Sequence, residues 1–278
     1  MQMKILMCSV PDGSLRNTLK PLLPRGNHYQ IPIEPVGILR LTTWVEKKGY
    51  SSDIYDTNNL RPSDEELIKN FKQTNPTVVG LSAPLSHCYP NVKRITKILR
   101  DLFPDVWIVL GGHLTGSANV VLDKTETDIC VVGDGEIPFV KLLDYFKLHP
   151  SRRQIDYTEL NKIKGLAFID ENYKLKVTGN AEQLTSSQMQ NPDLDKHKLG
   201  LQKFGGNGDL IHEFYEPIKN HSPLTKTTIG LKFYEKNKNK KIGNIQTVRG
   251  CVARCTFCQR YTKVYRVYAP NDLESRII

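Results

Sequence analysis

Long apolar runs are missing from this chain of 278 residues. No stretch approaches the roughly 18–20 apolar residues that a membrane-spanning helix needs, so the sequence predicts no membrane span. Residues Met1–Lys4 lead into a short strand-like run, not into the apolar core of a secretory signal. Hydrophobic residues make up 39% of the chain, which is enough for an ordinary core. We therefore expect a cytoplasmic protein with one large domain or two ordinary ones.

Acidic residues are outnumbered, because 29 of them accompany 39 lysines and arginines and leave a net charge of +10. Much of the excess lies in the segment Lys219–Lys241, which has seven lysines and one glutamate. A basic run can bind nucleic acid, but this one has few aromatic side chains to stack on bases. We interpret it as a solvated loop and expect no nucleic-acid partner.

Cysteine is scarce, and three of the six residues fall in one short stretch. Cys251, Cys255 and Cys258 form a C-x3-C-x2-C pattern, which lets one loop present several soft thiolates to one metal centre. Three thiolates on a four-iron cluster leave one iron open, and an open metal position can bind and activate a small molecule. The other cysteines lie in apolar or strand-edge contexts and are predicted to be core thiols. They are Cys8, Cys88 and Cys130.

Two other interpretations of the cysteine pattern stay open. One is a zinc site with His221 or His212 as fourth ligand, although neither histidine has the usual spacing to this loop. A zinc-stabilised protein that binds DNA or RNA would belong to this interpretation, and its binding would be sensitive to salt. The other is three unligated or disulfide-bonded cysteines, and a cytosolic setting argues against disulfides.

Short apolar runs alternate with amphipathic stretches over the first 150 residues. The predicted strands are 3–10, 50–56, 77–82, 106–110 and 128–132, and the predicted helices are 36–48, 63–73, 89–103, 117–124 and the stretch from 136 to 147. This alternation implies a parallel sheet covered on both faces. Right-handed crossovers then give an α/β, doubly wound, flavodoxin-like (Rossmann-like) sheet in the order 2-1-3-4-5.

The later part of the chain has weaker patterns. We place a domain boundary near Pro150–Arg153, so that residues 1–150 form the Rossmann-like domain and 151–243 a hairpin and linker region. The hairpin is predicted over Gly165–Gly179, and periodicity is poor from 181 to 244. Residues 244–278 contain the cysteine loop, with a predicted strand at Ile245–Val248 before it and the start of a helix at 270–278.

A ligand site is predicted at one edge of this sheet. In doubly wound folds, ligands bind beyond the carboxyl ends of the strands where the strand order reverses, here between strands one and three. Ser82 closes strand three, and Gly111 and Gly112 close strand four. The long loop 11–35 could cover a large ligand. Asp134 and Glu136, after strand five, would be favourable at the N-terminus of the next helix or could contact the ligand.

The cysteine stretch resembles the radical SAM enzymes, including Arg249-Gly250 before the first cysteine and Phe257 before the last. The resemblance implies that Cys251, Cys255 and Cys258 hold a [4Fe–4S] cluster whose open iron binds S-adenosylmethionine, with the backbone at Phe257 near the adenine. An electron from a reductant such as flavodoxin or ferredoxin would then release a 5′-deoxyadenosyl radical. Such enzymes have partial or full TIM barrels, and at most one barrel unit is present here, so we expect a fragment or truncated product.

The first half resembles the cobalamin-binding domains that precede many radical SAM barrels. The resemblance covers about residues 3–147, continues in the hairpin, and rests on the stretches Pro35–Gly37, Val79–Ser82, Leu110–His113 and Val132–Glu136. It implies that Ser82, Gly111, Gly112 and His113 contact cobalamin. The Asp-x-His-x-x-Gly motif of better-known cobalamin modules is missing after strand one, where His28 is the only histidine. We therefore predict cobalamin without a protein histidine on cobalt.

Two functions follow from these resemblances. The first is a cobalamin-dependent radical SAM enzyme, for example one that methylates an unactivated carbon of a small molecule or a peptide. The second is a non-catalytic cobalamin-binding module, inactive because the barrel is missing. No residue identifies the substrate, and no residue can be assigned a catalytic role by sequence alone.

Overall fold

The computed structural model describes residues 3–11, 35–189, 191–205, 230–240, 246–253, 255, 264–268 and 270. The strands in this part of the chain are β1 (Ile5–Ser9), β2 (Ser52–Tyr55), β3 (Val78–Ser82), β4 (Trp107–Gly111), β5 (Ile129–Val131), β6 (Leu166–Ile169), β7 (Leu175–Val177), β8 (Val248–Arg249) and β9 (Arg266–Val267). The α-helices there are α2 (Val36–Lys47), α3 (Thr57–Leu60), α4 (Asp64–Thr74), α5 (Tyr89–Leu102), α6 (Ala118–Lys124), α7 (Glu136–Leu148), α8 (Tyr157–Lys162), α9 (Leu194–Lys203) and α12 (Leu231–Asn237).

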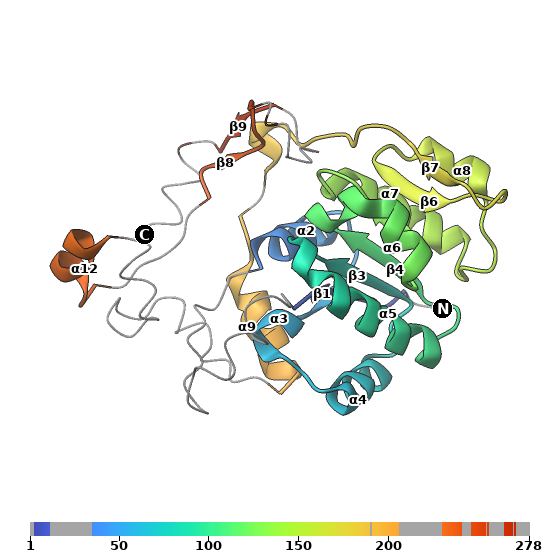
Figure 1. The fold of residues 1–278 in the computed structure, drawn as a ribbon, viewed down its shortest axis with the longest axis horizontal. Coiled ribbons are helices and arrows are strands. Elements are labelled where there is room, and N and C mark those ends of the chain that lie inside the picture. The colour runs from blue at the N-terminus through green and yellow to red at the C-terminus, as the bar shows by residue number, and fades with distance from the viewer. Residues whose placement is uncertain are drawn as a thin grey trace.

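A mostly parallel sheet forms the centre of the molecule (Figure 1). Its order is β2-β1-β3-β4-β5-β6-β7 within the described residues, and β1 to β5 pair in parallel. The predicted doubly wound sheet and its order 2-1-3-4-5 are confirmed. The predicted hairpin is β6–β7, and it joins the same sheet because Leu166 pairs antiparallel with Val131 of β5. The sheet therefore continues past the predicted boundary near Pro150–Arg153.

The sheet is buried on both faces, which explains why its strands are continuous apolar runs. In β1 the side chains alternate between two core clusters, with Leu6 and Cys8 in one and Ile5 and Met7 in the other. Helices α4, α5 and α6 cover the first cluster, and α2 and α7 cover the second. The predicted core thiols Cys8, Cys88 and Cys130 are all buried.

Local sequence signals set the ends of two helices. A capping box opens α4, because Ser63 Oγ accepts from the Glu66 N–H at 3.2 Å and the Glu66 carboxylate accepts from the Ser63 N–H at 2.8 Å. Helix α2 ends at Lys47, and Gly49 follows with φ at +83°. That left-handed conformation is the one that favours glycine after a helix.

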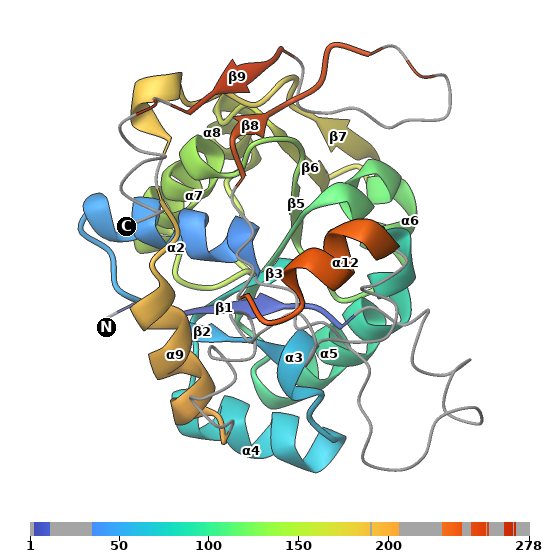
Figure 2. The same ribbon diagram turned by 90° about the vertical axis from the view of Figure 1, so that its left-hand side faces the viewer.

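The region 151–243 was predicted to be a hairpin and linker, and its described part also contains three helices that were not predicted: α8, α9 and α12. Helix α12 lies within Lys219–Lys241, so the prediction of a loop there was wrong for residues 231–237. Helix α9 lies along the edge strand β2 (Figures 1 and 2), and its His197, Gly200 and Leu201 are buried. A Cβ on Gly200 would lie 2.3 Å from the Ile54 carbonyl oxygen, so glycine allows this close approach. Within the described residues, no helix is long and apolar enough to cross a membrane.

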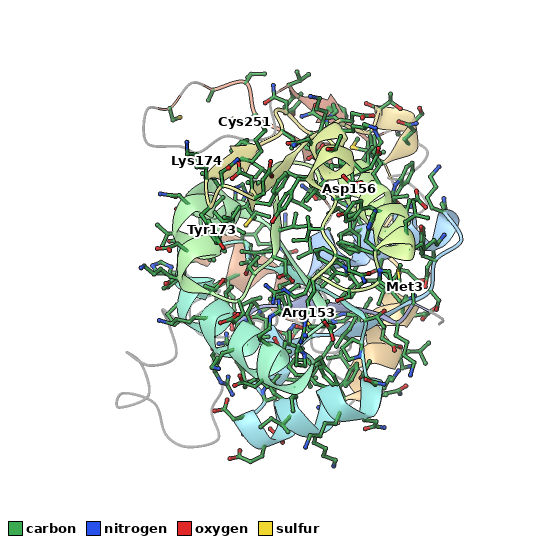
Figure 3. The ribbon with its side chains drawn as sticks, turned by 90° about the vertical axis from the view of Figure 1, so that its right-hand side faces the viewer. Met3, Arg153, Asp156, Tyr173, Lys174 and Cys251 are labelled. Atoms are coloured by element: carbon green, nitrogen blue, oxygen red, sulfur yellow. The ribbon has the colours of Figure 1, made fainter. Side chains whose placement is uncertain are left out.

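Strands β8 and β9 form a separate antiparallel ribbon at one edge of the sheet (Figure 2). The predicted strand Ile245–Val248 corresponds to the approach to β8, although residue 245 lies outside the described residues, as does most of the predicted helix 270–278. Figure 3 shows the opposite side of the molecule, where Met3 precedes β1 and Arg153 and Asp156 precede α8.

Candidate functional site at the carboxyl edge of the sheet

A cavity opens where three parallel strands end. Ser82 of β3 pairs with Ser9 of β1 on one side and with Gly111 of β4 on the other, so these strand ends lie at one level. The cavity there has a volume of about 630 Å³. It lies at the reversal of strand order beside β1 and β3, where a doubly wound sheet binds its ligands.

The floor of the cavity is apolar, with Met7, Val109 and Phe139 in its lining. Gly80 is part of the same floor, and a Cβ there would lie 2.7 Å from the Met7 sulfur. Gly37, in the first turn of α2, also lines the cavity, and a Cβ on it would meet nothing within 4 Å. The missing side chain at Gly37 therefore leaves open space for a ligand.

All four residues predicted to contact cobalamin line this cavity: Ser82, Gly111, Gly112 and His113. Gly112 has φ at +91°, and a Cβ on it would lie 2.5 Å from the Ala83 carbonyl oxygen, so the backbone itself requires glycine there. A Cβ on Gly111 would meet only the Leu81 carbonyl, at 3.8 Å. Gly111 is thus the better placed of the two for close approach of a ligand.

His87, in the loop after β3, is exposed in a short 3-10 turn, Ser86–Cys88, and is not part of the cavity lining. His28, with the rest of the loop 12–34 that was predicted to cover the ligand, lies outside the described residues. His212 and His221, the alternative zinc ligands, lie outside them as well.

The cysteine segment borders the same cavity from the other side. Arg249, Gly250 and Cys251 belong to the lining. Cys251 and Cys255 are exposed, and the Ala253 N–H donates to the Cys251 sulfur at 3.4 Å. Cys258 and Phe257 lie outside the described residues, and the described part shows no cluster of three metal-binding side chains.

Four charged side chains join the sheet to the cysteine segment. Asp134 and Glu136 follow β5 and are buried, each 4% exposed. Arg249 pairs with both, with Nη2 at 3.3 Å from Asp134 Oδ1 and Nη1 on the Glu136 carboxylate. Arg266 pairs with Asp134 and donates to the Leu184 carbonyl at 2.8 Å. Burial opposes the charge of Arg249, but the two carboxylates hold its pKa above the usual range.

Sequence analysis assigned Asp134 and Glu136 to a helix N-terminus or a ligand contact. Glu136 is the first residue of α7, so the helix-terminus interaction is present, and both residues line the cavity. Their pairing with arginines was missed, because Glu136 and Arg249 are 113 positions apart in the sequence. The signal that could have found it is the arginine immediately before the cysteine loop, which needs a carboxylate partner if it is buried.

A second buried network, also missed by the sequence, supports the far wall of the cavity. Asp56, at the end of β2, accepts from Ser9 Oγ at 2.5 Å and lies 2.7 Å from His197 Nε2 of α9. Burial raises the pKa of Asp56, but the hydrogen bonds from His197, Ser9 and Asn59 together hold it below its ordinary value. Ser9 itself lines the cavity.

The B12-binding domain family matches residues 26–143. The cytidylyl-2-hydroxyethylphosphonate methyltransferase of Streptomyces wedmorensis is 25% identical over 244 residues, which are 81% of this chain and 43% of that protein. The anaerobic magnesium-protoporphyrin IX monomethyl ester cyclase of Synechocystis sp. is 25% identical over 260 residues, which are 92% of this chain and 42% of that protein.

Two solved structures share the fold over 99% of this chain. One is the cobalamin-dependent S-adenosylmethionine radical enzyme OxsB with aqua-cobalamin and S-adenosylmethionine bound, with a TM-score of 0.63 and 16% identity over 31% of that enzyme. The other is the radical S-adenosylmethionine methyltransferase TsrM from Kitasatospora setae, with a TM-score of 0.61 and 15% identity over 45% of it. The chain thus matches the B12-binding domain over residues 26–143 and shares its fold with S-adenosylmethionine radical enzymes. It spans less than half the length of the curated relatives it matches.

The residues around the cavity fit a large organic ligand and a soft metal centre. An apolar cavity with an open glycine edge suits a large ligand with an extended organic ring. Two exposed thiols on one short segment suit a soft metal centre. The cavity lining contains residues of both regions, from Ser82 at one side to Cys251 at the other.

Proposed function

We propose that this chain is part of an enzyme that binds cobalamin, a [4Fe–4S] cluster and S-adenosylmethionine, and that uses a 5′-deoxyadenosyl radical to modify its substrate. The proposal rests above all on one observation. The cysteine segment and the carboxyl edge of the B12-binding sheet border the same cavity, because Cys251 and Ser82 both line it. Residues suited to each cofactor therefore lie within one site.

In this proposal Ser82, Gly111, Gly112 and His113 contact cobalamin, and Cys251, Cys255 and Cys258 hold the cluster. The apolar floor of Met7, Val109 and Phe139 excludes water from the inner face of the site. When bound, the reduced cluster supplies the electron that cleaves S-adenosylmethionine, and cobalamin supplies a methyl group. A protein reductant such as flavodoxin or ferredoxin would deliver the electron.

Methylation of an unactivated carbon is the reaction we favour. A methyltransferase is 25% identical to this chain over 244 residues, and a structure with the same fold is described as a radical methyltransferase. The similar cyclase indicates that the same architecture serves a second kind of reaction. We therefore propose the cofactors and the radical step for this chain, and we propose methyl transfer as the specific reaction.

Anaerobic iron–sulfur reconstitution of the full chain, followed by EPR of the reduced protein, tests this proposal. We expect about four irons and four sulfides per chain and a signal that changes when S-adenosylmethionine is added. Cys255→Ala should lose the cluster, because two cysteines cannot hold it. The matched control is Cys130→Ala, which removes a buried thiol of β5 that does not line the cavity and should keep full iron content.

Different outcomes would point to different functions. Zinc bound without labile sulfide, or full iron and sulfide in Cys255→Ala, would overturn the cluster assignment. Retention of cobalamin with no formation of 5′-deoxyadenosine from S-adenosylmethionine would favour the non-catalytic binding module. Formation of 5′-deoxyadenosine by the reduced chain would favour the enzyme.

A further inference from the structure

Two carboxylates and two guanidinium groups meet where the sheet contacts the cysteine segment. Arg249 pairs with Asp134 and Glu136, and Arg266 pairs with Asp134. The carboxyl side chains are 4% and 6% exposed, and the arginine side chains 17% and 9%. Because two negative charges face two positive ones, the cluster is buried without a net charge.

The two arginines occupy facing positions on the β8–β9 ribbon, where Arg249 is the register partner of Arg266. Residues 250–265, which contain all three cysteines of the motif, connect these two positions. Asp134 and Glu136 therefore form ion pairs with the chain immediately before the cysteine loop, at Arg249, and Asp134 also pairs with the chain immediately after it, at Arg266.

The ribbon has a second attachment to the sheet domain. Arg40 of α2 donates to the Gln246 side-chain oxygen, and its guanidinium lies 4.7 Å from the centre of the Tyr268 ring. Arg40 is 4% exposed and Tyr268 is 1% exposed. This contact holds residues on both sides of the loop as well, and it does not involve Asp134 or Glu136.

We propose that Asp134 and Glu136 are positioning residues that hold the two ends of the cysteine loop, at Arg249 and Arg266, beside the cavity at the carboxyl edge of the sheet. They set where Cys251 lies relative to Ser82 across that cavity. The part of this inference that concerns cofactors rests on the proposed function, because it places the cluster relative to cobalamin. The part that concerns the chain stands on the ion pairs alone.

Glu136→Gln tests this inference, because it keeps the size of the side chain and removes the charge facing Arg249. The matched control is Asp128→Asn, at the other end of β5. Asp128 is also a buried carboxylate between two arginines, Arg100 and Arg152, and it does not touch the ribbon. Each variant removes one buried negative charge that faces arginines, and in each case an arginine keeps a second carboxylate: Arg249 keeps Asp134 and Arg100 keeps Glu126. Both variants should therefore destabilise the sheet domain to a similar degree.

Amide hydrogen exchange of the full chain, without cofactors, separates the two variants. We expect exchange in residues 246–253 and 264–268 to become faster by about tenfold or more in Glu136→Gln, and to stay as in the parent chain in Asp128→Asn. Equal exchange of the ribbon in both variants would overturn the inference, because loss of stability alone would then explain the change. A ribbon that is unaffected in Glu136→Gln would overturn it too.

A spectroscopic measurement tests the cofactor part. In the reconstituted chain with cob(II)alamin, a reduced cluster nearby shortens the spin relaxation time of the cobalt. We expect this effect to weaken in Glu136→Gln, with iron, sulfide and cobalamin contents unchanged, and to persist in Asp128→Asn. An unchanged spin relaxation time of the cobalt in Glu136→Gln would contradict the inference, and the proposed function would still stand. If the parent chain assembles no cluster, the proposed function fails, and the hydrogen-exchange comparison still decides the role of Asp134 and Glu136.

Discussion

The pKa values of two buried carboxylates in this chain, Asp128 and Asp56, are shifted in opposite directions. Asp128, between two arginines, has its pKa raised because burial outweighs the favourable charges. Asp56 is equally inaccessible, and burial again raises its pKa, yet the hydrogen bonds from His197, Ser9 and Asn59 prevail and lower it overall. Because both carboxylates are buried, burial alone does not set the direction in which the pKa of a carboxylate moves.

The pH dependence of stability should report the Asp56 network. The folded-state pKa of Asp56 is lower than its ordinary value of 3.8, so the carboxylate stabilises the fold above that value. This contribution disappears as the pH falls through the folded-state pKa. We expect Asp56→Asn to lower the free energy of unfolding by about 1–3 kcal/mol at about pH 5, and by less at about pH 2–3.

Urea unfolding of both proteins across this pH range checks that expectation. A difference between the parent chain and Asp56→Asn that stays constant with pH would show that the charge of Asp56 contributes nothing to stability. Asp123→Asn is a suitable control, because Asp123 is exposed and pairs only with its neighbour Lys124 among the described residues.

At the scale of elements, the contact between α9 and β2 depends on one small residue. The Gly200 position leaves no room for a Cβ, since the nearest backbone atom, the Ile54 carbonyl oxygen, would lie at 2.3 Å. Gly200→Ala should push α9 away from β2 and lower the free energy of unfolding by about 1–3 kcal/mol, although alanine favours helices. Leu199→Ala, on the exposed face of the same helix, should change stability little.

Thermal and urea unfolding of these two variants, together with protease sensitivity of residues 194–203, provides the measurement. If Gly200→Ala were as stable as the parent chain, the close packing of α9 on β2 would be wrong. Loss of the packing should also loosen His197, because that histidine reaches Asp56 only while α9 lies against the sheet.

Elements with local signals were predictable, and elements held by distant contacts were not. The five β-α units follow from apolar runs, the Ser63 capping box and Gly49, all within a few residues of the features they set. The order of the strands followed from the handedness of crossovers. Helix α9 was missed because few apolar residues mark it, and its attachment runs through Gly200 and His197 to residues far earlier in the chain.

The candidate site was predictable to a similar extent. Four residues at the strand ends were selected because parallel strands end at one edge, and all four line the cavity. The three cysteines were selected by their spacing, and the cluster that they would hold stays a prediction. The ion pairs between Asp134, Glu136 and the arginines were not found, because their partners are brought together only by the complete fold. A place near the N-terminus of the next helix already explained Asp134 and Glu136 in the sequence. Nothing in the sequence then required a distant arginine as their partner.

At the scale of the whole molecule, the cavity lies between the strand ends near Ser82 and the cysteine segment at Cys251. A substitution at Gly37, which also lines the cavity, tests whether cobalamin binds there. The Cβ of Gly37→Leu would meet no atom within 4 Å, and leucine favours helices more than glycine does, so the fold should keep its stability. The same side chain would occupy the ligand's volume. We expect the affinity for cobalamin to fall by about tenfold or more.

Absorbance titration with hydroxocobalamin, alongside thermal unfolding, measures both effects. Gly37→Ala is the matched control, because a single methyl group leaves most of the cavity open and should reduce the affinity much less. Unchanged cobalamin affinity in a stably folded Gly37→Leu protein would place the ligand elsewhere.

The ion pairs of Asp134 and Glu136 with Arg249 and Arg266, which flank residues 250–265, also reduce the conformational entropy of that loop. A loop whose ends are free must lose conformational freedom before several of its residues can meet at one point, and that loss grows with the logarithm of its length. Here the folded sheet domain has already brought the ends of the loop together. The three cysteines start from a closed ring of chain, and a metal centre that assembles there needs to order only the residues inside the ring.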